Sequence, residues 1–197
     1  MIGIDEDYKE ILTILSSEIN SKVKIYLDTK YWIDICDVTL GKKENNEIKN
    51  IYLYLKKGVK NNQLICPISY RIFKEVLRQN DEESLNQTIL IIDELSKGSI
   101  LREEKDRLSL ELFNFFYDKL NIETDEKTRE NYWDYIINIM GFYIPTLPSL
   151  SEKDNQMIQK EWLKDIKNIR LKDMLNTSLK NELFMFKDMK INTDIYD

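Results

Sequence analysis

The fold of this chain is decided by the stretch Val23-Lys24-Ile25-Tyr26-Leu27-Asp28-Thr29. Its first five residues are rich in β-branched and aromatic side chains, which predicts a buried strand over residues 23–27. The run Gln63-Leu64-Ile65-Cys66-Pro67-Ile68 predicts a second strand. Helices are expected at 31–38, 47–61 and 70–79. This order describes a βαβ unit, whose parallel strands end at one sheet edge, where open α/β sheets bind ligands.

Helices are predicted along most of the remaining chain. The apolar spacing predicts them over residues 5–20, 82–97, 103–120, 125–140 and, in one or two pieces, 153–190. Three residues stand where helix N-caps are expected, namely Ser69, Asp81 and Ser151. Gly 5 and Pro 3 are low counts, which argues against turn-rich all-β folds. The predicted class is therefore α/β, with a small parallel sheet, a large helical portion and mostly helical content overall.

The composition restricts the chemistry that the chain can perform. Among its 197 residues there is no histidine, which excludes Ser-His-Asp and Cys-His sites, His-ligated zinc and haem histidines. A metal site would be built from oxygen ligands, which suit Mg²⁺ or Mn²⁺. Lys+Arg 29 against Asp+Glu 35 gives a net charge of −6, which does not favour nucleic-acid binding over the whole surface.

The cysteines and the start of the chain indicate a cellular compartment. Cys36 and Cys66 form no CxxC motif and are expected to be reduced, buried thiols. The acidic residues Asp5-Glu6-Asp7 are unlike a secretory signal. No apolar run approaches the roughly 18 residues that a membrane span needs. We therefore expect a cytoplasmic protein with no membrane partner.

Two carboxylates are the candidates for chemistry. Asp28 follows the first predicted strand directly, and Glu75 lies in the helix that follows the second. Because the first strand ends, and that helix begins, at the same sheet edge, the two side chains could converge there. Converging carboxylates repel each other unless a cation lies between them. The pair therefore predicts a divalent metal that could activate water for attack on a phosphodiester.

Two blocks of this sequence resemble the PIN domain family of metal-dependent ribonucleases, familiar as the toxins of toxin–antitoxin pairs. The blocks are Ile25-Tyr26-Leu27-Asp28-Thr29-Lys30-Tyr31-Trp32-Ile33-Asp34 and the segment from Pro67-Ile68-Ser69 to Glu75-Val76-Leu77. The resemblance implies that Asp28 and Glu75 are acidic ligands of Mg²⁺ or Mn²⁺, supported by the Thr29 hydroxyl. It also implies RNA as the substrate and an antitoxin or another protein as a possible partner.

The resemblance divides the chain into four parts. They are an N-terminal helix (1–21), a PIN-like βαβ core (22–80), a helical insertion (81–190) and the start of a C-terminal PIN-like segment (191–197). Lys30 stands where the family often has asparagine. The family implies a third acid, for which Asp197 is the first candidate and Asp194 the second. Since no residues follow to supply a fourth acid, we expect a truncated gene product, a fragment or a member that has lost the site.

Simpler interpretations of the same residues stand beside these. Asp28 could cap the helix that follows it, and Glu75 could be a solvated helix residue. Lys30, Lys56 and Lys57 are candidate contacts to an RNA backbone, or else a solvated basic face.

The aromatic cluster Phe113, Phe115, Phe116 and Tyr117 is expected in the core of the helical portion, with a partner interface as the alternative. The leading function is a PIN-like endoribonuclease, or a truncated remnant of one. The alternative is a non-catalytic PIN-like protein that acts as a protein–protein interaction module. A third possibility is a helical regulatory protein without the βαβ unit.

Overall fold

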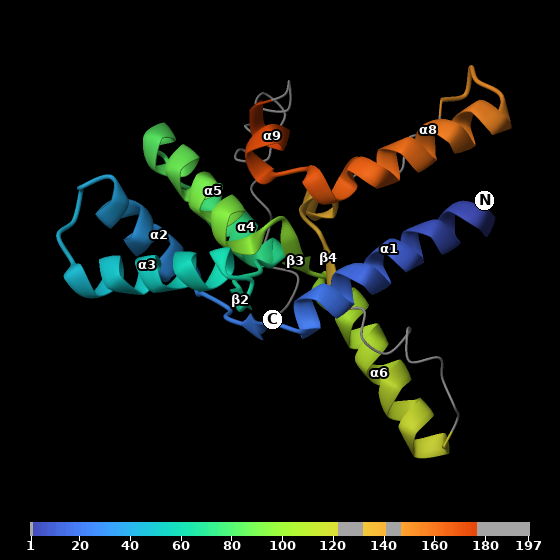
Figure 1. Ribbon diagram of the computed structural model, residues 1–197, viewed down its shortest axis with the longest axis horizontal. Coiled ribbons are helices and arrows are strands. Elements are labelled where there is room, and N and C mark those ends of the chain that lie inside the picture. Colours follow the sequence, from blue (N-terminus) through green and yellow to red (C-terminus); the bar gives the residue numbers. More distant parts are fainter. Residues whose placement is uncertain (1, 122–131, 141–146, 177–197) are drawn as a thin grey trace, which may run out of the picture.

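The computed structural model describes residues 2–121, 132–140 and 147–176 (Figure 1). The α-helices are α1 (Ile2–Asn20), α2 (Thr29–Thr39), α3 (Asn46–Lys60), α4 (Tyr70–Val76), α5 (Glu82–Ser96), α6 (Glu104–Leu120), α8 (Glu152–Asp165) and α9 (Leu171–Asn176). The strands are β1 (Val23–Lys24), β2 (Leu64–Ile65), β3 (Ser99–Leu101) and β4 (Trp133–Tyr135). Two 3₁₀ helices, η1 (Ile136–Met140) and η2 (Ile166–Asn168), complete the described elements.

The predicted βαβ unit is present. Strands β1 and β2 pair in parallel, with Val23 opposite Leu64 and Lys24 opposite Ile65. The amide of Ile25 donates to the carbonyl of Ile65 at 3.0 Å, which continues the ladder by one bond. Helices α2 and α3 connect the strands and α4 follows β2, so the predicted element order is confirmed. The described chain is mostly helical with a small parallel sheet, and in this broad sense the fold is α/β.

The first strand is shorter and more exposed than predicted. A buried strand over 23–27 is wrong, because β1 spans two residues and Val23 is 63% exposed. Among the described residues β1 pairs with β2 alone, so it is an edge strand with one side open. Burial begins only at Leu27, whose carbonyl accepts a hydrogen bond from the indole of the fully buried Trp32 at 3.2 Å.

A second pair of strands adjoins the first. Strands β3 and β4 pair antiparallel, and a bridge between Ile68 and Ile100 connects β3 to the segment after β2. The helix predicted over 125–140 is therefore wrong at 133–135, and residues 125–131 lie outside the described part of the chain. Trp133 and Tyr135 have high strand propensity, and the free edge of β3 supplies hydrogen bonds that local spacing does not reveal.

The core lies where α1, α2, α3, α5 and the two strand pairs meet (Figure 1). Helix α1 buries the face predicted for it, with Leu12, Leu15 and Ile19 inside. Cys36 and Cys66 are buried free thiols, as expected. Each predicted N-cap side chain accepts a backbone amide: Ser69 for α4, Asp81 for α5 and Ser151 for α8.

Helix α6 differs most from expectation. The prediction that its aromatic cluster forms a core is wrong, because no residue of this described helix is buried. The helix begins just after β3 and extends away from α2, α3 and α5 (Figure 1). None of the described helices combines the length and the apolar composition of a membrane-spanning helix.

Candidate functional site

The candidate site lies where β1 and β2 end and the helices after them begin. Asp28 is the N-cap of α2, and its carboxylate accepts the Lys30 amide at 3.0 Å. The simpler interpretation of Asp28 as a cap is therefore confirmed. Capping uses one lone pair of a carboxylate that offers about four, so it does not preclude a second role.

Glu75 is brought to this edge by α4. The hydroxyl of Thr29, the residue after Asp28, donates a hydrogen bond to Glu75 Oε2. The other oxygen of the same carboxylate lies 3.4 Å from Arg71 Nε, one helical turn earlier in α4. The Glu75 side chain is 36% exposed and engaged on both oxygens. Thr29 at the start of α2 and Glu75 in α4 were both predicted as site residues, and their hydrogen bond connects the two helices.

A second side-chain hydrogen bond connects the same two parts of the chain. The hydroxyls of Tyr26 and Ser69 lie 2.8 Å apart, so the segment after β1 is tied to the first residue before α4. Ser69 Oγ also accepts the Ile72 amide at 3.4 Å as the cap of α4. We call Tyr26, Asp28, Thr29, Ser69 and Glu75 the strand-end site. The two hydrogen bonds connect the segment from Tyr26 to Thr29 with the start and the body of α4, and one of them holds the Glu75 carboxylate.

The donor set of the strand-end site suits a hard cation. Asp28 and Glu75 offer carboxylate oxygens, and Mg²⁺ commonly uses one or two carboxylates together with water and substrate phosphates. Within residues 2–121, 132–140 and 147–176 no three acidic or cysteine side chains gather as a metal-binding group. Asp197 and Asp194, the candidates for a third acid, lie outside these ranges.

The basic residues predicted to contact RNA have different surroundings. Lys30 is exposed in the first turn of α2, directly beside Asp28. Lys56 in α3 is paired with Glu94 at 2.7 Å, and its ammonium group lies over the Tyr52 ring. Lys57 is exposed in the last turn of α3. Arg71, which sequence reasoning missed, lies nearer to Glu75 than any of these; its spacing of four residues from Glu75 on a helix was the available signal.

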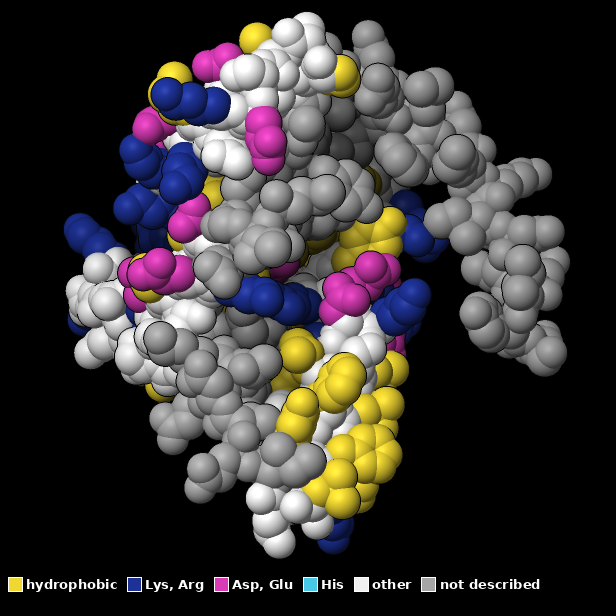
Figure 2. All heavy atoms as spheres, turned by 90° about the vertical axis from the view of Figure 1, so that its right-hand side faces the viewer, with side chains coloured by type: hydrophobic (Ala, Val, Ile, Leu, Met, Phe, Trp, Pro, Cys, Tyr) yellow, Lys and Arg dark blue, Asp and Glu magenta, His cyan; other side chains and the backbone are white. Residues whose placement is uncertain are grey.

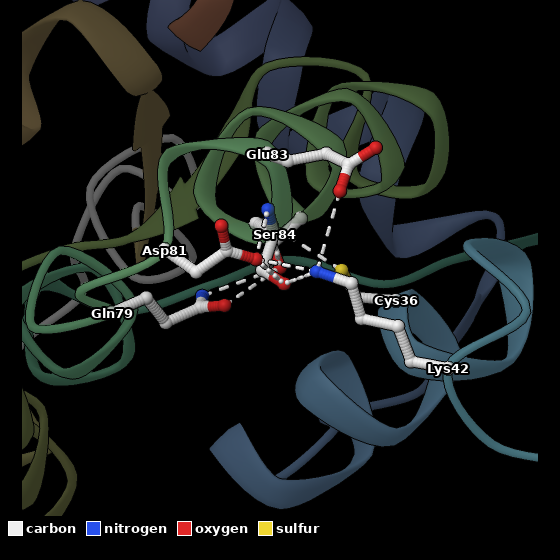
Figure 3. Close-up of polar contacts among 7 residues, drawn as sticks. Cys36, Lys42, Gln79, Asp81, Glu83 and Ser84 are labelled. Atoms are coloured by element: carbon white, nitrogen blue, oxygen red, sulfur yellow. Dashed lines mark hydrogen bonds and ion pairs between the residues drawn. The ribbon is translucent and has the colours of Figure 1, made fainter.

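A separate polar cluster joins the α2–α3 loop to the start of α5 (Figure 3). Lys42 forms an ion pair with Asp81, and its Nζ lies 2.8 Å from Ser84 Oγ. The Ser84 hydroxyl donates to Asp81 at 2.7 Å, and the Cys36 thiol donates to the Ser84 carbonyl at 3.3 Å. A serine beside a lysine raises the possibility of a nucleophile and its base.

The charge of this cluster argues against that chemistry. The hydrogen bond to Asp81 raises the pKa of Lys42, so the lysine stays an ammonium and cannot accept a proton from Ser84. Burial raises the pKa of Cys36, so its thiol is not activated either. We interpret the cluster as a structural link. The spacing Asp81-x-x-Ser84 indicates the helix cap from the sequence alone. The contact of Lys42 with this cap could not be predicted, because the fold brings the two together.

Comparison with known proteins adds no assignment for the strand-end site. No family model, no curated protein and no solved structure matches this chain.

Proposed function

We propose that the chain is a metal-dependent ribonuclease of PIN-like type, with Asp28 and Glu75 as ligands of Mg²⁺ or Mn²⁺. The observation that supports this most is the hydrogen bond from Thr29 to Glu75. It brings a carboxylate of α4 against the residue next to Asp28, at the edge where parallel strands end.

The side chains of the strand-end site have distinct tasks in this proposal. Thr29 orients the Glu75 carboxylate, and the α2 cap orients Asp28. Arg71 and Lys30 supply positive charge for an RNA phosphate. A cation bound to Asp28 and Glu75 would supply water activation for hydrolysis of a phosphodiester. Asp197 remains a proposed third ligand.

An RNA cleavage assay tests the proposal. The substrate is a fluorescently labelled single-stranded RNA, incubated with Mg²⁺, with Mn²⁺ or with EDTA. We expect cleavage that requires the metal and falls at least about 100-fold in Asp28→Asn and in Glu75→Gln. Asparagine still caps a helix, so Asp28→Asn removes the charge without removing the α2 cap.

Asp81→Asn is the matched control, because Asp81 is also an N-cap aspartate but belongs to the Lys42 cluster. We expect its cleavage rate to equal that of the wild type. Cleavage that is absent from the purified wild type, or unchanged in Asp28→Asn, would contradict the proposal.

The second candidate is a non-catalytic interaction module built on the same fold. It is favoured by the exposed apolar side chains of α6, which resemble an interface more than a solvated surface. This candidate predicts no cleavage in any of the three solutions and no loss of partner binding in Asp28→Asn. A metal-dependent rate that falls in both carboxylate variants would exclude it as the sole function.

A further inference from the structure

Helix α6 carries a continuous apolar row on its surface. Leu108, Leu112, Phe116 and Leu120 follow one another at intervals of four residues, so they form one stripe along the helix. Phe113 and Phe115 flank the stripe. These six side chains are between 52% and 65% exposed. Figure 2 shows a large apolar patch at the height that α6 occupies in Figure 1.

A stripe of this kind normally packs against another element. Surface helices of folded domains turn their apolar face inward and their charged face outward, whereas α6 exposes both. Contiguous apolar patches of several hundred Å² on a protein surface usually mark an interaction site. We therefore expect another protein surface to pack against this face of α6.

The sequence of the stripe favours a second copy of the same helix. In one direction it reads Leu-Leu-Phe-Leu and in the other Leu-Phe-Leu-Leu, with its midpoint at Asn114. Two antiparallel copies related by a two-fold axis would place Leu108 opposite Leu120 and Leu112 opposite Phe116. Each contact along the stripe is then leucine against leucine or leucine against phenylalanine, as a self-complementary apolar interface requires. Rows spaced by four residues are also the ridges that helix pairs commonly interdigitate.

Charge and area agree with this occupant. The helix has four acidic and three basic residues, so it offers no strong charge to select a nucleic acid or another highly charged partner. Covering six half-exposed large side chains removes roughly 100 Å² each, or about 1,200 Å² over two copies. That area lies at the lower end of the range for specific, stable interfaces.

We propose that the chain is a homodimer whose interface is the α6 stripe, packed antiparallel about a two-fold axis. The dimer does not depend on the strand-end site or on its metal. No residue of the strand-end site lies in α6, so each copy keeps its own site outside the interface.

Sedimentation velocity on the full chain tests the oligomeric state. We expect a mass near twice 23.6 kDa at micromolar concentration. Leu112→Glu should raise the dissociation constant at least about 100-fold, because each dimer loses two buried leucines and gains two buried charges. Leu53→Glu is the matched control, since Leu53 is a similarly exposed leucine of another helix, α3, and should leave the dimer intact. A monomeric wild type, or a dimer that survives Leu112→Glu, would overturn the proposal.

Cysteine cross-linking tests the orientation and does not require a disruptive charge. Cys36 and Cys66 are buried, so they should not form intermolecular disulfides. Residues 108 and 120 lie about 18 Å apart along the helix. We expect Leu108→Cys alone and Leu120→Cys alone to remain uncoupled on oxidation, and an equimolar mixture to form a covalent dimer. A disulfide within either single variant, or none in the mixture, would refute the antiparallel pairing.

Discussion

Asp93 of α5 holds the start of α9, a helix that begins 78 residues later in the chain. Its carboxylate oxygens accept the amide of Leu171 at 2.8 Å and the amide of Lys172 at 2.9 Å. The Asp93 side chain is 8% exposed, so water does not readily replace it. We therefore expect Asp93→Ala to weaken the fold more than the loss of an ordinary surface cap.

The size of the effect follows from the two amides. A buried donor left without a partner costs about 1–3 kcal/mol. One of the two amides is buried and the other is partly buried, so the free energy of unfolding should fall by about 2–4 kcal/mol. For a chain of this length that corresponds to a decrease in Tm of roughly 5–12 °C. Asp93→Asn should lose about half as much, because an amide oxygen can replace only one carboxylate oxygen.

The pH dependence provides a second signature. Burial raises the pKa of Asp93 above its ordinary value, despite the two amides that favour the charged form. A carboxyl with a higher pKa in the folded state binds its proton more tightly there, so its contribution to stability falls as the pH rises through that pKa. The destabilisation by Asp93→Ala should therefore be larger at pH 4 than at pH 7.

Urea unfolding, followed by circular dichroism at both pH values, measures these differences. Asn86→Ala is the control, because Asn86 is exposed on the same helix, and it should stay within about 0.5 kcal/mol of the wild type. An Asp93→Ala variant as stable as Asn86→Ala would show that the two amides find other partners. A destabilisation that grows from pH 4 to pH 7 would refute the assigned pKa direction.

Three further predictions concern residues in the βαβ core or directly after it. Gly58→Ala should lower Tm although alanine favours helices, because the new Cβ would lie 2.4 Å from Leu64 Cδ2; an increase in Tm would contradict this. Burial raises the pKa of Cys66 to about 12, so a thiol reagent at pH 8 should modify it only after denaturation, and rapid modification of the native protein would contradict its burial. The hydrogen bond from Lys42 lowers the pKa of Asp81, so this pair stabilises the fold above about pH 4 and is lost as the pH falls. Asp81→Asn should accordingly flatten the decrease in Tm between pH 5 and pH 3, and an unchanged slope would argue against the pair.

Features that depend on neighbouring residues could be predicted from the sequence. The caps Ser69, Asp81 and Ser151 are local, because each side chain accepts the amide of the residue three positions later. The order of strands and helices in the βαβ unit follows from hydrophobic spacing in the same way. The approach of Glu75 to the start of α2 could be inferred as well, since it requires only that the two strands be parallel.

Several other features depend on distant partners and could not be predicted. Trp133–Tyr135 is a strand because β3 offers a free edge, and its own spacing is also compatible with a helix. The spacing of α6 indicates an apolar face but not whether anything in the chain covers it. Asp93 and Lys42 form their contacts with segments far away in the sequence, 78 and 39 residues in the two cases. Their roles become visible only in the fold.

A calorimetric Mn²⁺ titration tests the proposed metal site most directly, because it requires no knowledge of the RNA substrate. The proteins are the wild type, the Asp28→Asn/Glu75→Gln double variant and the control Asp81→Asn. We expect saturable binding to the wild type and to the control, and none to the double variant. Absence of binding to the wild type, or equal binding to the double variant, would contradict a metal site formed by Asp28 and Glu75.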